Sequence, residues 1–134
     1  MSYKLEKLPN EPITVYTALD FDLNELPQSD QALYTLLAKQ TDMVYHVLDL
    51  TSLKLSFEEL VQAAGHLAFG ENATFRHPIF RKMVRGVIFV TDDNTISMSG
   101  KALDSDVYGN IPVTVFSSME SALQYIRGEI NKFG

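Results

Sequence analysis

The chain has 134 residues, of which 46% are hydrophobic and 21% charged, and its formal net charge is -6 at pH 7. This size and composition predict one globular domain over residues 1–134 and exclude wholesale disorder. The acidic balance argues against nucleic-acid binding, because phosphate backbones select basic surfaces. The absence of cysteine excludes disulfides, thiol catalysis and thiolate metal sites.

No part of the sequence predicts export or a membrane span. The first residues lack the apolar region of a signal peptide, and no apolar run approaches the roughly 20 residues that cross a bilayer. We therefore expect a cytoplasmic protein without a membrane span. No motif in the chain calls for a cofactor.

The N-terminal part of the chain predicts a hairpin followed by a helix. Tyr3 to Leu8 alternates apolar and polar residues, as a half-buried edge strand does, and Ile13 to Leu19 follows as a second strand. Asp20 to Pro27 is predicted to be a polar loop. Gln28 to Gln40 is predicted to be a helix. Its buried face is expected to consist of Leu33, Leu36 and Leu37.

A strand followed by a capped helix occupies the centre of the chain. Val44 to Leu50 is rich in β-branched and aliphatic residues and predicts a third strand. Ser56 and Glu59 have the spacing of a capping box, in which each side chain satisfies a backbone donor at the start of a helix. The inner stripe of this helix is expected to consist of Leu60, Val61, Ala64, Leu67 and Ala68.

The C-terminal half continues this alternation. Gly70 to Pro78 is expected to be a loop or a broken helix, and Val84 to Thr91 a strand whose central VIFV is buried on both faces. A short helix is predicted from Ser99 to Tyr108, and Pro112 to Phe116 is predicted to be the fifth strand. Ser117 and Glu120 form a second capping box. The last helix has the apolar stripe Met119, Ala122, Leu123, Ile126 and Ile130.

The resulting order of elements, β-β-α-β-α-β-α-β-α, is typical of α/β proteins. It predicts a single mixed, mostly parallel sheet of about five strands with helices packed on it. An unpaired sheet edge invites pairing, so the strand from Tyr3 to Leu8 is a candidate site of homodimerisation.

The third strand and the turn after it resemble the STAS domain, and more narrowly the SpoIIAA-like proteins related to anti-sigma-factor antagonists. In that family a similar strand ends in Asp, an aliphatic residue, Ser or Thr, and a turn of small residues. The residues that fit this pattern are Asp49, Leu50, Thr51 and Leu53. The final helix, SSMESALQYIRG, is also similar, and the element order matches over roughly residues 3 to 130. The resemblance implies a SpoIIAA-like fold and a non-enzymatic regulatory or protein-interaction module that engages a protein partner.

The usual phosphoserine switch of this family is not expected. Phosphoregulated antagonists carry an Asp-Ser or Ser-Ser pair at the start of the helix after this strand, and a partner kinase phosphorylates one serine. The corresponding segment here runs from Leu55 to Glu59, and Ser56 is its only hydroxyl. We expect Ser56 to cap the helix, and the carboxylates of Glu58 and Glu59 would repel a phosphate there.

A basic cluster between residues 76 and 85 contrasts with the acidic chain. Its members are Arg76, Arg81, Lys82 and Arg85, and His77 adds charge at lower pH. Aromatic and aliphatic residues are interleaved with them. The segment is a candidate docking surface for an acidic partner, or a rim for an anionic head group. The alternative is a solvated face over buried aromatic residues, with the cations paired locally.

The strand-end loops are the second candidate surface, because ligands of open α/β sheets bind outside the carboxyl ends of the strands. The polar residues there are Asp49, Thr51, Ser52, Ser56, Thr91, Asp92 and Ser117. Ser117 abuts a helix N-terminus, whose free backbone donors suit an anion, although it can equally cap its own helix.

Two alternative functions remain open. One is a carrier of a small apolar or amphipathic ligand, which would require a pocket between the second helix and the sheet. The other is a metal-dependent phosphoacceptor or enzyme that uses Asp20, Asp22 and Asp49, although a serine pair stands where such a site needs a Lys. The three histidines have no metal-ligand spacing, and His46 is expected to be a packed residue with one satisfied nitrogen.

Overall fold

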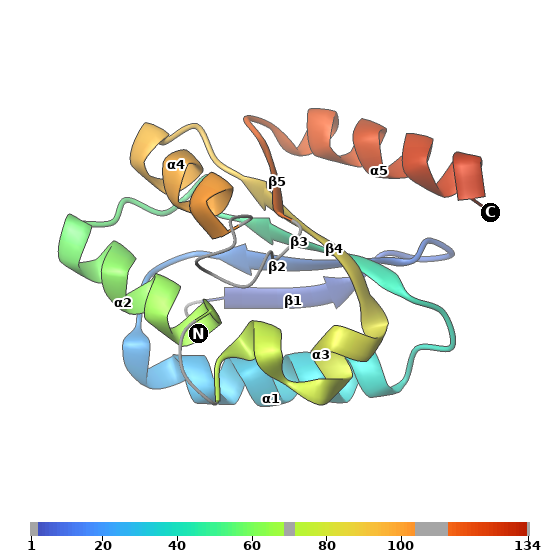
Figure 1. The fold of residues 1–134 in the computed structure, drawn as a ribbon, viewed down its shortest axis with the longest axis horizontal. Helices are drawn as coiled ribbons and strands as arrows, with labels where there is room; N and C mark the ends of the chain where they lie inside the picture. The colour runs from blue at the N-terminus through green and yellow to red at the C-terminus, as the bar shows by residue number, and fades with distance from the viewer. Residues whose placement is uncertain (1–2, 69–71, 104–112, 134) are drawn as a thin grey trace.

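The computed structural model of the chain describes residues 3–68, 72–103 and 113–133. Five strands form one sheet: β1 (Tyr3–Lys7), β2 (Ile13–Ala18), β3 (Val44–Asp49), β4 (Val84–Val90) and β5 (Val113–Phe116). They lie side by side in sequential order (Figure 1). β1 pairs with β2 antiparallel, and every other pair is parallel. The predicted mixed, mostly parallel sheet and its N-terminal hairpin are thus confirmed. β1 is the edge strand, and a dimer through that edge stays a prediction.

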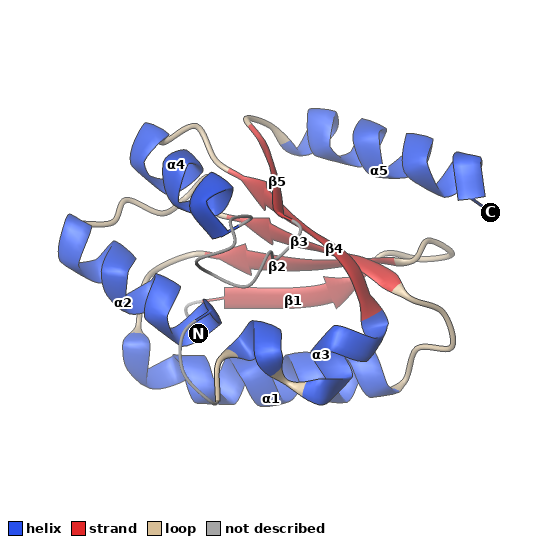
Figure 2. Cartoon of the chain, in the orientation of Figure 1, coloured by secondary structure: helices blue, strands red, loops and turns tan. Residues whose placement is uncertain are grey.

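Helices follow or connect the strands throughout the described residues (Figure 2). The α-helices are α1 (Leu26–Ala38), α2 (Phe57–Ala68), α3 (Pro78–Met83), α4 (Asn94–Leu103) and α5 (Met119–Phe133). Two short 3-10 helices, η1 (Leu23–Glu25) and η2 (Thr74–Arg76), precede α1 and α3. Within the described ranges, none of the helices is long and apolar enough to cross a bilayer.

The two faces of the sheet are covered by different helices. On one face, α1, α2 and α3 pack against β3 and β4, with Leu33, Ala68 and Phe80 in the shared core. α4 lies on the same face, because its Gly100 approaches the side chains of Phe89 and Val115. On the opposite face, α5 packs its apolar stripe against β2, β3 and β4. The predicted burial of VIFV in β4 on both faces is confirmed, since none of its residues is more than 4% exposed.

Helix α3 is absent from the sequence-based prediction, which places a loop up to Pro78 and nothing between that loop and β4. The helix begins after His77, whose Nδ1 accepts a hydrogen bond from the Ile79 N–H at 3.1 Å. Pro78 stands at its first position, where a missing N–H costs nothing. A helix of six residues is too short to display a 3.6-residue period, which explains why the pattern gave no signal.

The prediction for helix α4 is wrong at its start, because the helix begins at Asn94 rather than Ser99. Asp93 is its cap: its Oδ1 accepts the N–H of Thr95 at 2.8 Å and that of Ile96 at 3.0 Å. Several of the polar residues that follow β4 are equally good helix caps, so the sequence does not mark the start of the helix clearly. The predicted end of this helix and the first residue of the predicted fifth strand lie outside the described residues.

Some of the helix caps and buried helix faces that the sequence predicts are confirmed, and others are wrong. The capping box of α2 is confirmed, since Ser56 Oγ accepts the Glu59 N–H at 3.1 Å and Glu59 Oε1 accepts the Ser56 N–H at 3.0 Å. At α5 the cap is Ser118, whose Oγ accepts the N–H of Ser121 at 3.2 Å, and not the predicted Ser117. The predicted inner stripe of α2 is wrong at Val61, which is 54% exposed.

The substitution of glycine by alanine is expected to have opposite effects on stability at two helical positions. A Cβ on Gly100 would lie 2.8 Å from Phe89 Cδ2 and 3.0 Å from Val115 Cγ2, whereas a Cβ on Gly128 of α5 would meet no atom within 4 Å. We expect Gly128→Ala to raise the free energy of unfolding by about 0.5–1 kcal/mol through helix propensity. Gly100→Ala should lower it, because overpacking costs about 1–3 kcal/mol and exceeds that gain. Urea unfolding of both variants is the measurement, and equal stabilisation by both would contradict the close packing of α4.

Candidate functional site

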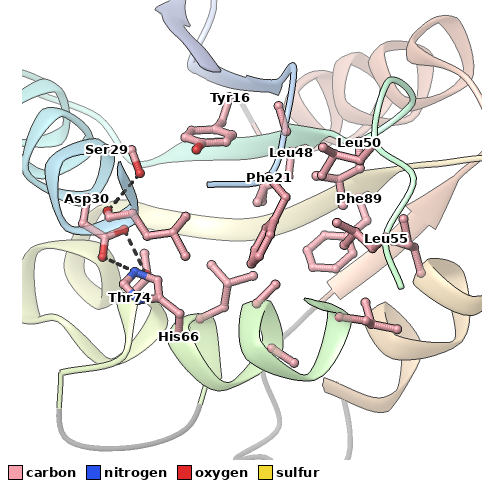
Figure 3. Close-up of a pocket in the computed structure, with 18 of the residues that line it drawn as sticks. Tyr16, Phe21, Ser29, Asp30, Leu48, Leu50, Leu55, His66, Thr74 and Phe89 are labelled. Carbon is pink, nitrogen blue, oxygen red and sulfur yellow. Dashed lines mark hydrogen bonds and ion pairs between the residues drawn. The ribbon is translucent and has the colours of Figure 1, made fainter. Parts of the chain in front are cut away.

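An apolar cavity lies between α2 and the sheet, with a volume of about 110 Å³ (Figure 3). Its walls come from β2, β3 and β4, from α1, α2 and α4, and from the loops that follow β2 and β3. These loops leave the carboxyl ends of their strands, the end at which α/β sheets commonly bind ligands. Apolar residues of these walls include Ala18, Phe21, Leu33, Leu48, Leu55, Leu60, Phe89 and Ile96.

The local sequence explains why this space is apolar and unfilled. Leu48 of β3 faces the helices, and the chain beyond β3 adds Leu53 and Leu55 to the same wall. On the opposite wall, α2 contributes the small residues Ala63 and Ala64. Small side chains on a helix that faces a sheet leave volume that larger residues would occupy.

One end of the cavity is polar and is built around Asp30 of α1. Asp30 Oδ2 lies 2.6 Å from His66 Nε2 of α2, and Asp30 Oδ1 accepts a hydrogen bond from Thr74 Oγ1 of η2 at 3.0 Å (Figure 3). The side chains of His66 and Asp30 are 22% and 14% exposed. Burial raises the pKa of the Asp30 carboxyl above its usual value, although its bonds to His66 and Thr74 act in the opposite direction.

Other polar groups at the cavity are also hydrogen-bonded. Tyr16 of β2 hydrogen-bonds with Ser29 of α1, and burial raises the pKa of the Tyr16 hydroxyl. Ser29 Oγ in turn donates to the Leu26 carbonyl at 3.0 Å. His46 of β3 is buried, and its Nδ1 lies 2.8 Å from Thr14 Oγ1 of β2, as expected for a packed histidine. The cavity therefore presents polar atoms that are already paired.

A second, polar groove adjoins the cavity. Its volume is about 650 Å³, and its residues come from α1, α2, η2 and the start of α3. Asp30 and His66 line both the groove and the cavity. Tyr34 and His77 stack in the groove wall, with ring centroids 3.8 Å apart. Burial raises the pKa of Tyr34 to about 12, so its hydroxyl stays neutral.

The structure divides the predicted basic cluster. Arg76 and His77 line the polar groove, whereas Arg81, Lys82 and Arg85 are exposed and line neither the groove nor the cavity. Among the described residues, none of the four cations forms an ion pair. The interleaved apolar residues that are buried beneath the segment are Phe75, Phe80 and Met83.

The polar residues predicted at the strand ends do not line the cavity or the groove. Asp49 Oδ1 accepts the N–H of Thr51 at 3.1 Å and its hydroxyl at 2.6 Å, so the carboxylate shapes its own turn. Thr91 Oγ1 similarly accepts the N–H of Asp93 at 3.0 Å. Ser56 is engaged in the capping box, and Ser52, Asp92 and Ser117 are exposed.

The acidic residues of the metal-dependent alternative are only partly brought together. Asp20 and Asp22 line the cavity, and each accepts a backbone N–H of its own loop, whereas Asp49 lies apart from it. Within the described ranges, no group of three or more His, Asp or Glu side chains could hold a metal ion.

Sequence analysis missed the polar end of the cavity. Asp30 is 36 residues from His66 and 44 from Thr74, and no local motif links them. The one signal in the sequence that could have pointed to this cluster is the polar residue His66 on a helix that packs against the sheet. Its partner Asp30 belongs to α1 and is identified only by the fold, which brings the two side chains together.

Comparison with solved structures agrees with the architecture. The chain superimposes with a TM-score of 0.58 on a protein from Shewanella loihica PV-4, described as an uncharacterized protein from DUF3478 family with a SpoIIAA-like fold. The two share 14% sequence identity over 92% of this chain and 91% of the other. The fold of this chain is therefore SpoIIAA-like. No protein-family model and no curated protein matches the sequence.

Buried His46 predicts a loss of stability in acid. Complete burial lowers its pKa from 6.5 to about 4 in the folded state. Between these two values the unfolded chain binds a proton that the folded chain excludes, so stability is full above about pH 6.5 and falls as the pH decreases toward 4. The loss should reach about 3 kcal/mol.

The measurement is urea unfolding of the wild type and of His46→Gln at several values between pH 7 and pH 4. Gln is neutral and can still bond Thr14, so the variant should lack this part of the pH dependence. The difference between the two proteins isolates the imidazole from the carboxylates that titrate in the same range. Parallel curves for the two proteins would show that His46 does not titrate as described.

Proposed function

We propose that this protein binds a small apolar or amphipathic molecule and acts as a non-enzymatic carrier. The observation that carries the proposal is the cavity between α2 and the sheet. A carrier requires a cavity at this location, whereas a pure interaction module does not. Concave, mostly apolar sites with a few placed polar groups are typical of small-molecule binding sites. The Asp30–His66–Thr74 cluster supplies such polar groups at one end.

The size of the cavity limits the buried part of the ligand. Its volume of about 110 Å³ is of the order of the roughly 150 Å³ apolar cavity that accommodates benzene in another protein. One ring or a short alkyl chain therefore fits inside. Since association costs several kcal/mol and few heavy atoms are buried, a dissociation constant between roughly 10 µM and 1 mM is expected.

The test is calorimetric titration with 1-octanol, an uncharged probe with an alkyl chain. Ala64→Phe places a ring in the cavity and should weaken binding at least about tenfold, since each 1.4 kcal/mol lost is a factor of ten. Val61→Phe is the matched control, because Val61 lies on the same helix, is exposed and does not line the cavity. It should bind like the wild type.

Thermal unfolding shows whether each variant is folded. If Ala64→Phe is not, Ala63→Leu adds less volume at a neighbouring lining position and takes its place. Failure of the folded wild type to bind 1-octanol, or equal binding by the cavity variant and its control, would overturn the proposal.

A protein-interaction module, as implied by the resemblance to anti-sigma-factor antagonists, is the second candidate. The favouring observation is the exposure of Phe57 and Val61 on consecutive turns of α2, at 75% and 54%. Native mass spectrometry of protein gently purified from its own cells separates the two candidates. A retained small molecule would support the carrier. A retained protein that is lost on Phe57→Ser would support the interaction module.

A further inference from the structure

The apolar cavity and the polar groove meet at a single pair of side chains. Asp30 and His66 line both spaces, and their side chains lie 2.6 Å apart at the polar end of the cavity (Figure 3). Thr74, which donates to Asp30, lines the cavity, and Ala73 before it lines the groove. The apolar space thus adjoins a polar one at a single pair of polar side chains.

The charges of the groove favour an anion. Arg76 is exposed in the groove wall and forms no ion pair with any described residue. Among the described residues, Asp30 is the only carboxylate that lines the groove, and it already has His66 and Thr74 as partners. Arg76 is therefore a cation of the groove wall without a described ion-pair partner, whereas both oxygens of the Asp30 carboxylate are already engaged, although the chain as a whole carries a net charge of -6.

His77 adds a second donor to the groove. Its Nδ1 accepts the Ile79 N–H at 3.1 Å, so the proton of the neutral ring resides on Nε2. Stacking against Tyr34 fixes the plane of the ring. A guanidinium and an imidazole N–H on one wall form a suitable combination for a carboxylate, because charge-assisted hydrogen bonds to such a group are strong.

We propose that the ligand is an anionic amphiphile whose apolar body occupies the cavity and whose carboxylate lies in the groove beside Arg76 and His77. The Asp30–His66 pair marks the point at which the ligand passes from the apolar to the polar space. This assignment rests on the proposed carrier function and adds to it the chemical class of the ligand and the residues that select it.

The test compares octanoate with 1-octanol, which share an alkyl chain of the same length and differ in the charged head. Calorimetric titrations at pH 7.5 should show that the wild type binds octanoate about tenfold more tightly than 1-octanol, the ratio expected for one charge-assisted hydrogen bond. Arg76→Gln should abolish this preference and leave the affinity for 1-octanol unchanged. Arg85→Gln removes an exposed cation outside the groove and should change neither affinity.

A second pair of variants adds charge instead of removing it. Gln31 lines the groove and is exposed, so Gln31→Glu should weaken octanoate binding by repulsion without an effect on 1-octanol. Gln28→Glu places the same charge on the same helix outside the groove and serves as its control. Both positions are exposed, so the variants should fold like the wild type.

The outcomes separate this inference from the function on which it rests. If the wild type binds 1-octanol and octanoate equally, or if Arg85→Gln is as damaging as Arg76→Gln, the anionic head group is wrong and the carrier function stands. If neither compound binds, the carrier function fails and the head-group assignment fails with it. Selective loss of octanoate binding in Arg76→Gln and Gln31→Glu is the expected result.

Discussion

All helices that link two parallel strands lie on the same face of the sheet, and the rest of the structure depends on this constraint. Parallel strands in sequential order are joined by crossovers of one hand, so each connecting segment packs on the same side. α1, the pair α2 and α3, and α4 share that face and its core. Ala63 and Ala64 of α2 line the space between this layer and the sheet. Their small side chains leave part of that space unfilled, and this unfilled part is the cavity.

The same layer contains its own polar crosslink. An isolated carboxylate would cost several kcal/mol to remove from water, and the partners of both Asp30 oxygens offset part of this cost. Its partners belong to α2 and η2, so one residue of α1 joins three segments of the helical layer. The interaction that fixes these segments relative to one another also places polar atoms beside an apolar space. The structural role of this pair and the binding role proposed for it therefore coincide.

Local signals in the sequence were sufficient for the fold. The hairpin, the buried strands and the capping box of Ser56 and Glu59 each depend on residues close together in the chain, and the structure confirms them. The errors occurred where the local signal was short or ambiguous. Helix α3 has too few residues for a period, and α4 is preceded by several polar residues that cap equally well.

The candidate site was less accessible to such reasoning. Several leucines of its walls were recognisable as core residues. A cavity forms where the side chains are too small to fill the space between two elements, and the hydrophobic pattern of a sequence does not show this. The groove residues Arg76 and His77 were identified as part of a basic cluster, and only the fold distinguishes them from Arg81, Lys82 and Arg85. Asp30 and His66 become partners only through the packing of two helices.

The one-sided crossovers also affect how the chain folds as it is synthesised. Because the connecting helices lie on the other face, α5 is the only described helix that covers residues such as Ile13, Val47 and Ile88, and it follows the last strand. Until residues 119–133 have left the ribosome, an otherwise assembled sheet exposes a broad apolar surface. In general, apolar surface that is exposed during folding favours aggregation. Docking of α5 is thus the step that covers this face of the sheet.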